Sequence, residues 1–163
     1  MAERLALRSG IGYDSHRFAP GGPLVLGGIA IPSDVHLHGH SDGDAIAHAV
    51  TDAILGAAAL GDIGAMFADT DAANAGRDSI EMLQLATARV HSAGWRVAQV
   101  DVVVIAESPK IAPHRDAMRA RIAMALDCGV ADVSIKGKTN EGMGSIGRGE
   151  GIACLATATL YRE

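Results

Sequence analysis

Three residues in the first third of the sequence have the types and spacing of a metal site. Asp14 and His16 are two residues apart, and His48 follows the run His40-Ser41-Asp42-Gly43-Asp44. On an extended segment, residues i and i+2 point to the same face, so Asp14 and His16 can hold one ion together. One carboxylate and two imidazoles leave a coordination position open, which is typical of catalytic sites. The pattern therefore predicts a catalytic divalent metal at these three side chains.

A helix is expected to carry His48. Ser41 and Asp44 have capping-box spacing, which predicts a helix from about residue 42 to residue 60. His48 then lies about two turns into the helix. Asp52 is four residues later, on the same helical face, so we expect its carboxylate to orient the His48 imidazole.

A rival set of imidazoles occurs at His36, His38 and His40, where alternation could also gather ligands on one face. We interpret His36 and His38 as part of a polar loop. His40 differs because it abuts the N-terminus of the expected helix, where anions are attracted.

The remaining pattern predicts an α+β fold. Strands are expected at about residues 5–13, 24–31, 97–106, 133–138 and 152–161, and two further helices at 78–94 and 113–128. Residues 61–77 form a long loop rich in Gly and Asp, which is typical of a lid or binding loop. We therefore expect a single domain over residues 1–163, with a four-to-five-stranded mixed sheet covered on one side by three helices.

Composition narrows the class of protein. The chain is 48% hydrophobic but only 3% aromatic, and small side chains bury little area each, so we expect subunit contacts to complete its burial. The net charge of −5 argues against a nucleic-acid partner, and no apolar run is long enough for a membrane span. Cys128 and Cys154 are interpreted as small core residues of a reducing compartment, which predicts a cytoplasmic protein.

Two further segments could bind a phosphorylated ligand. Residues 106–110 follow a strand and could form a pocket for a small planar ring. Thr139 and Glu141 precede a Gly-rich loop at 142–151, and Glu141 could hold a second cation that prefers oxygen ligands, such as magnesium. No G-x-S-x-G elbow occurs, so nothing supports an acyl-transfer serine.

Six runs spread over essentially the whole chain resemble the 2-C-methyl-D-erythritol 2,4-cyclodiphosphate synthase family. They are Gly12-Tyr13-Asp14-Ser15-His16, His40-Ser41-Asp42-Gly43-Asp44, Leu60-Gly61-Asp62-Ile63-Gly64, Phe67-Ala68-Asp69-Thr70-Asp71, Pro109-Lys110 and Gly147-Arg148-Gly149-Glu150-Gly151. The resemblance implies a homotrimer with active sites at subunit interfaces. It also implies a metal-dependent phosphorus–oxygen lyase of the non-mevalonate isoprenoid (terpenoid) pathway. Such an enzyme converts 4-diphosphocytidyl-2-C-methyl-D-erythritol 2-phosphate to the cyclic diphosphate and releases CMP.

The resemblance also implies roles for individual residues. Asp14, His16 and His48 would bind zinc, Glu141 would bind magnesium or manganese, and His40 and Thr139 would stabilise the transition state. The segment from Ala106 to Ala112 would form the cytosine pocket. The implied substrate-binding positions are Asp14, His16, His40, Ser41, Asp62, Ile63, Gly64, Phe67, Ala68, Asp69, Thr70, Asp71, Ala106, Pro109, Lys110, Ile111, Ala112, Lys138, Thr139, Asn140, Glu141, Ser145 and Arg148.

The chain departs from the family pattern at four positions. Lys138 and Asn140 stand where threonine is common, and Ser145 and Tyr13 stand where phenylalanine is common. The last two bear on an apolar central cavity in which some family members hold an isoprenoid diphosphate.

Two alternatives are open at the level of the sequence. Two histidines and a carboxylate also suit a non-haem iron oxygenase, although nothing in the sequence supplies an arginine that would bind an oxoacid. The other alternative is a non-catalytic trimer that binds a metal and cytidine nucleotides.

Overall fold

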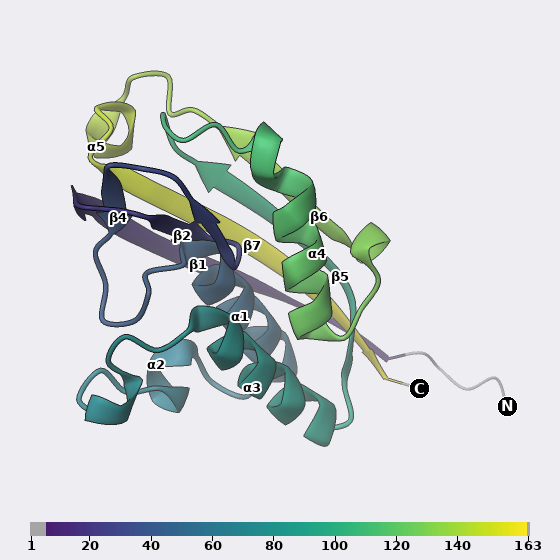
Figure 1. Ribbon diagram of the computed structural model, residues 1–163. Coiled ribbons are helices and arrows are strands. Elements are labelled where there is room, and N and C mark those ends of the chain that lie inside the picture. The colour runs from purple at the N-terminus through teal and green to yellow at the C-terminus, as the bar shows by residue number, and fades with distance from the viewer. Residues whose placement is uncertain (1–5, 163) are drawn as a thin grey trace, which may run out of the picture.

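The computed structural model describes residues 6–162 and has an α+β architecture (Figure 1). The elements in chain order are β1 (Ala6–Pro20), β2 (Leu24–Leu26), β3 (Ile29–Ile31), β4 (Val35–Leu37), α1 (Ala45–Ala58), α2 (Ile63–Met66), η1 (Ala72–Asn74), α3 (Ser79–Ser92), β5 (Arg96–Ile105), η2 (Ala112–His114), α4 (Arg115–Leu126), η3 (Val130–Asp132), β6 (Val133–Lys138), α5 (Gly144–Gly147) and β7 (Gly151–Arg162). The expected strand start at Leu5 lies outside the described residues.

Five strands form one mixed sheet in the order β4-β1-β7-β5-β6. Strands β5 and β6 are parallel, whereas the other neighbours are antiparallel. Strands β2 and β3 form a separate two-stranded sheet. The expected α+β class, with a five-stranded mixed sheet and three main helices, is confirmed.

The three long helices lie together on one side of the sheet (Figure 1). Helix α1 packs on β1 and β7, α4 packs on β6, and α3 packs against both of these helices. Alternate residues of β5 (Val100, Val102 and Val104) are fully buried, as expected for a strand with one face toward a helical layer. Cys154 is buried on β7 and is a free thiol, as is the half-buried Cys128.

Helix α1 approaches β1 unusually closely because the strand presents glycines to it. A Cβ on Gly12 would lie 1.8 Å from the carbonyl oxygen of Ala49, and a Cβ on Gly10 would lie 2.2 Å from that of Ala53. No larger residue fits at either strand position without moving the helix. Since Asp14 continues the same alternation along β1, its side chain also points toward α1.

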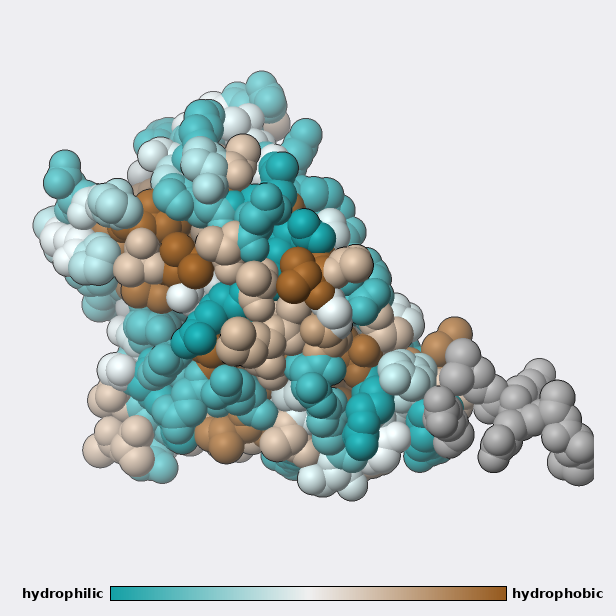
Figure 2. Space-filling model, turned by 45° about the vertical axis from the view of Figure 1, so that its right-hand side comes forward, coloured by the Kyte–Doolittle hydropathy of each residue, from teal (hydrophilic) through white to brown (hydrophobic). Residues whose placement is uncertain are grey.

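The opposite face of the sheet carries exposed apolar side chains. Leu7, Ile11 and Tyr13 alternate along β1, and Leu155 lies opposite Tyr13 on β7. Ile11 is 69% exposed. In the view of Figure 2, by comparison, hydrophobic residues form separate patches among hydrophilic ones. Contiguous exposed apolar residues on a sheet are typical of a protein–protein interface.

Two expected boundaries near the metal ligands were wrong. Helix α1 begins at Ala45 rather than near residue 42, because Asp44 and not Ser41 is its N-cap. Strand β1 continues to Pro20 rather than ending at Tyr13, so Asp14 and His16 lie within the strand. The ligand pair is therefore held in the sheet by its pairing with β7, and β4 joins β1 only from Phe18 onward.

Other differences concern short elements. The expected strand over 24–31 is a hairpin, because Gly27 and Gly28 both adopt positive φ (+59° and +72°), as a two-residue turn of this kind requires. Strand β4 pairs with the end of β1 where a polar loop was expected. The expected loop 61–77 contains the single turns α2 and η1. No helix within residues 6–162 combines the length and hydropathy that a membrane span requires.

Candidate active site

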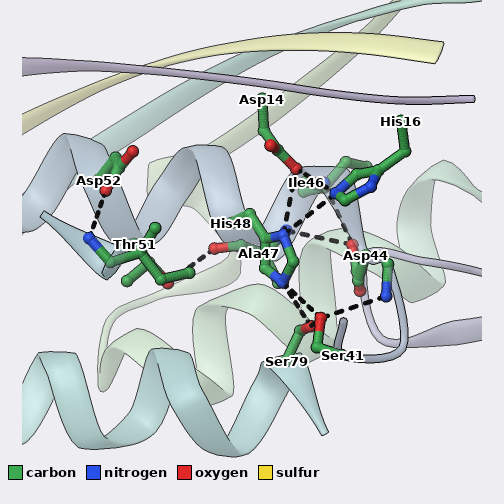
Figure 3. A network of polar contacts seen from close by, with 12 residues as sticks. Asp14, His16, Ser41, Asp44, Ile46, Ala47, His48, Thr51, Asp52 and Ser79 are labelled. Carbon is green, nitrogen blue, oxygen red and sulfur yellow. Dashed lines mark hydrogen bonds and ion pairs between the residues drawn. The ribbon is translucent and has the colours of Figure 1, made fainter. Parts of the chain in front are cut away.

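Asp14, His16 and His48 converge between β1 and α1 (Figure 3). The Asp14 Oδ2 atom lies 2.8 Å from His16 Nε2 and 3.1 Å from His48 Nδ1, and the two ring nitrogens are 3.3 Å apart. Among the described residues, these three form a group whose ligand atoms all lie within 4.8 Å of one another. The side chains are 12–24% exposed, so one side of the group remains open.

These separations fit a tetrahedral metal. Bonds of about 2.0–2.2 Å to nitrogen and oxygen place neighbouring ligand atoms roughly 3.3–3.5 Å apart in a tetrahedron. The separation of 2.8 Å between Asp14 and His16 would have to widen by roughly 0.5–0.7 Å, and the other two by at most about 0.4 Å. Three ligands from the chain would leave the fourth position for substrate or water.

Hydrogen bonds outside the cluster orient both imidazoles. His16 Nδ1 lies 2.8 Å from the carbonyl oxygen of His38, and His48 Nε2 lies 2.8 Å from Ser79 Oγ. In each ring, the other nitrogen faces Asp14. Metal-binding histidines usually have such an outer partner, which fixes the ring tautomer.

The expected role of Asp52 was wrong. Although Asp52 is one turn beyond His48 on α1, its Oδ1 accepts the backbone N–H of Ile63 at 2.7 Å and points away from His48 (Figure 3). Asp52 therefore anchors the start of α2 instead. The partner of His48 comes from another helix, through Ser79.

The environment favours an ionised carboxylate within the cluster. Burial opposes the charge on Asp14, but contacts with His16 and His48 outweigh it, so the Asp14 pKa lies below its ordinary value. Burial likewise opposes the charge on His16, but Asp14 outweighs it and the His16 pKa lies above 6.5. Proton and metal therefore compete for the same nitrogen of His16.

A pocket of about 230 Å³ opens beside the cluster. It brings together nine residues singled out from the sequence and two that were missed, Asn74 and Met82. The full lining is Asp14, His16, His40, Ser41, His48, Ile63, Gly64, Phe67, Asp69, Asn74 and Met82. Met82 lies on α3 and has no motif, so only helix packing reveals it. His40 lines the pocket but is four residues before the N-cap of α1, so it does not abut the helix as expected.

The segment 61–77 is tied to the loop that carries His40. The backbone N–H of Gly76 donates to the His40 carbonyl oxygen at 2.8 Å, and that of Asp42 donates to the carbonyl oxygen of Arg77 at 3.2 Å. Within the segment, Asp62 and Asp71 accept backbone N–H groups at the starts of α2 and η1. Neither these two aspartates nor Ala68 and Thr70 line the pocket.

The remaining candidate residues form a second group, at the ends of β5 and β6. Ile105 pairs with both Lys138 and Ala153, and Ala153 pairs with Ser15, so Lys138 is level with Ser15 across the sheet. Three strand spacings separate them, roughly 14 Å at about 4.8 Å each. One chain therefore does not bring this group against the metal cluster formed by Asp14, His16 and His48. The members of the group are Ala106, Pro109, Lys110, Ile111, Ala112, Lys138, Thr139, Asn140 and Glu141.

The two loops of this second group are linked to each other. Glu107 Oε1 accepts the backbone N–H of Asn140 at 2.8 Å, and the N–H of Ala106 donates to the Lys138 carbonyl oxygen. Thr139 Oγ1 donates to Glu141 Oε1 at 3.0 Å. An exposed carboxylate of this kind suits magnesium, which often takes one or two carboxylates and completes its shell with water and phosphate oxygens.

Ser145 lines a different, open groove of about 600 Å³. The groove is also bordered by Ser15, Arg17 and Glu150, and it reaches the metal cluster at His16. Arg148 is exposed and pairs with Glu150 at 2.7 Å.

The sequence matches the YgbB family over residues 7–161. It is 65% identical over 156 residues to a 2-C-methyl-D-erythritol 2,4-cyclodiphosphate synthase of Gemmatimonas aurantiaca. These residues cover 96% of this chain and 94% of the relative. The bifunctional IspDF of Campylobacter jejuni superposes with a TM-score of 0.94 at 40% identity, over 98% of this chain and 43% of the longer one. A CDP complex of IspF from Plasmodium falciparum gives a TM-score of 0.84 at 34% identity, over 96% and 97% of the two chains.

Proposed function

This chain belongs to the YgbB family, and from that membership we infer that it forms 2-C-methyl-D-erythritol 2,4-cyclodiphosphate. The reaction is a step of the non-mevalonate route to isoprenoid precursors. The observation that carries the assignment is the convergence of Asp14, His16 and His48 beside an open pocket. The substrate is 4-diphosphocytidyl-2-C-methyl-D-erythritol 2-phosphate, and CMP is the leaving group.

The chemistry requires no base from the protein. The nucleophile is the 2-phosphate of the substrate, whose second pKa is about 6, so it is already anionic near neutral pH. A 2-phosphate oxygen attacks the diphosphate phosphorus that is bonded to the methylerythritol. The bond between that phosphorus and the bridging oxygen breaks, and this oxygen leaves with CMP.

The main barrier is repulsion between two phosphates in one molecule. Asp14, His16 and His48 would hold zinc, and Glu141 would hold magnesium or manganese. When bound, these cations would supply positive charge that offsets the repulsion and stabilises departing CMP. The residues of the chain bind and bend the substrate so that the two ends meet, because effective molarity depends on geometry. We assign transition-state stabilisation to His40 and Thr139.

The segment 61–77 restricts water at the reacting phosphorus. Ile63, Gly64 and Phe67 bring apolar surface to the pocket, and Phe67 is held beneath the Arg77 guanidinium at 5.2 Å from the ring centre. Water at this phosphorus would give hydrolysis in place of ring closure, so exclusion of water determines the product.

We further propose that the active enzyme is a homotrimer in which a second copy completes each site. The metal cluster and the group around Glu141 lie roughly 14 Å apart in one chain at about 4.8 Å per strand, too far for one substrate phosphate to touch both. The helix-free face with Ile11 and Tyr13 offers apolar surface for the contact. The partner's loops would then bring the cytosine pocket and Lys110 to the metal cluster.

The other assignments follow from this enzyme. The Plasmodium falciparum relative was solved as a CDP complex, which supports a binding site for a cytidine nucleotide, and we propose Ala106 to Ala112 as its location. Of the other substrate contacts proposed from the sequence, Ser145 borders the groove next to His16, and Arg148 is adjacent in sequence to Gly149 of its lining. We expect one domain over residues 1–163 and a cytoplasmic location, which agrees with two free thiols.

Phosphorus NMR of the purified protein with the diphosphocytidyl substrate tests the assignment. The signals of the open diphosphate should give way to those of the cyclic diphosphate and of CMP, and a chelator should stop this change. His48→Ala should lose the tightly held metal and nearly all CMP release while it keeps the fold. Nucleotide binding without turnover would instead identify a non-catalytic binding protein, and full activity of the variant would refute the role of His48.

A further inference from the structure

A continuous chain of polar contacts leads from the metal ligands into the protein. His48 Nδ1 lies 3.1 Å from Asp14 Oδ2, and its Nε2 lies 2.8 Å from Ser79 Oγ (Figure 3). The Ser79 hydroxyl in turn donates a hydrogen bond to Asp42 Oδ1. None of the sequence motifs includes Ser79, because it lies 31 residues from His48 on a different helix.

The chemistry of these groups fixes the direction of each hydrogen bond. A carboxylate only accepts, so the Ser79 hydroxyl must donate its single proton to Asp42. The Ser79 oxygen is then left to accept a hydrogen bond from His48, and Nε2 must carry the ring proton. The lone pair of a neutral His48 ring is therefore on Nδ1, the nitrogen that faces Asp14 and His16.

Ser79 is buried, and its hydroxyl is not the cap of its own helix. It is the first residue of α3, but the cap of that helix is Asp78, whose side chain accepts the N–H groups of Ile80 and Glu81. Ser79 is fully buried, and its own backbone N–H donates to Asp42 Oδ2 at 3.1 Å. Asp42 thus holds both the hydroxyl and the backbone of Ser79.

Ser41 also contacts the same nitrogen, but in a different setting. Its Oγ lies 3.0 Å from His48 Nε2 and 3.4 Å from Ser79 Oγ. Ser41 lines the pocket, whereas Ser79 does not. A hydroxyl at the pocket wall can turn toward a bound phosphate. The buried Ser79 is therefore the partner that stays with His48 both before and after substrate binds.

We propose that Ser79, held by Asp42, is a positioning residue that keeps His48 in the tautomer and orientation that present Nδ1 to the metal. The role rests on the metal centre of the proposed function. Loss of such an outer partner typically lowers metal affinity 10–100-fold.

Zinc affinity of metal-stripped protein, measured by competition with a chromophoric chelator, tests the proposal. Ser79→Ala should weaken Zn²⁺ binding about 10-fold, and Ser41→Ala/Ser79→Ala should weaken it about 100-fold because both hydroxyl partners are then lost. The matched control is Ser92→Ala on the same helix. The Ser92 hydroxyl donates to the Ala88 carbonyl oxygen, so this variant should bind Zn²⁺ as the wild type does. Equal affinity of Ser79→Ala and Ser92→Ala would overturn the proposal.

A second measurement separates positioning from loss of fold. In zinc-loaded protein labelled with nitrogen-15 histidine, the His48 Nε2 proton should exchange with solvent much faster in Ser79→Ala than in the control. If Ser79→Ala does not fold, Asp42→Asn is used, which weakens the acceptor for the Ser79 hydroxyl and should still lower affinity several-fold. Unchanged affinity in Asp42→Asn would then overturn the proposal. If the wild-type protein binds no Zn²⁺, the metal centre itself is refuted. That result differs from equal Zn²⁺ affinities of Ser79→Ala and Ser92→Ala, which would refute only the role of Ser79.

Discussion

Replacing Gly12 with alanine tests whether the close approach of α1 to β1 sets the geometry of the metal ligands. The new Cβ would lie 1.8 Å from the Ala49 carbonyl oxygen, whereas real Cβ contacts are essentially never shorter than 3.0 Å. The helix must therefore retreat by about 1.2 Å or more at Ala49, the residue next to His48. In a metal site the metal–ligand distances are expected to lie within about 0.2 Å of their usual values.

The expected result is a larger loss of metal binding than of stability. Overpacking of this kind typically costs about 1–3 kcal/mol of unfolding free energy, which a folded domain can survive. Displacement of His48 removes a direct ligand, so the Zn²⁺ dissociation constant should rise more than 100-fold, beyond the effect of losing an outer partner. Chelator competition measures the affinity, and circular dichroism melts measure the stability of the metal-free protein.

Gly56→Ala is the matched control because it makes the same change on the other partner of this contact. Gly56 lies within α1, and the nearest atom to its new Cβ would be the Ile11 carbonyl oxygen at 4.0 Å. Alanine is the better helix former, so this variant should gain up to about 1 kcal/mol and keep its metal. If Gly12→Ala binds Zn²⁺ within threefold of Gly56→Ala, the spacing of β1 and α1 does not position the ligands.

Three other predictions concern stability, pH and assembly. Asp44→Ala removes the acceptor for two N–H groups of α1 and two of the β2–β3 turn, so chemical denaturation should show a loss of about 3–5 kcal/mol, against about 1 kcal/mol for the cap variant Asp78→Ala. Because the His16 pKa is raised above 6.5, Zn²⁺ affinity should already fall as pH drops from 8 toward 6.5, and an affinity that stays constant over this range would contradict competition for His16. In the metal-free protein, the charge on His16 stabilises the fold below this pKa, so that stabilisation should be lost as pH rises through it. Ile11→Asp should sediment as a monomer and lose activity. Met124→Asp changes an equally exposed residue on α4 and should still sediment as a trimer, at three times the 16.7 kDa chain mass. A trimeric Ile11→Asp would exclude the helix-free face of the sheet as the interface.

Local patterns in the sequence were enough to predict much of the fold. The capping residue Asp78 and the helical spacing after it predicted α3, and the apolar run around Val102 predicted β5. Both depend on interactions over a few residues, such as a side chain that accepts a nearby N–H group. The predicted start of α1 was wrong because the capping box assigned the cap to Ser41, whereas Asp44 caps the helix and also accepts the N–H groups of the β2–β3 turn.

The candidate site divides in the same way. The i, i+2 spacing of Asp14 and His16 in the sequence already determined that they share a face, since that depends only on strand geometry. It could not determine that His48 bonds to Ser79 and not to Asp52, because four-residue spacing makes two side chains neighbours without directing them at each other. The distance of roughly 14 Å between the metal cluster and the group around Glu141, at about 4.8 Å per strand, also follows only from the order of strands in the sheet. Contacts between separate elements depend on how closely those elements pack, and Gly12 on β1 permits the close approach of α1, which carries His48.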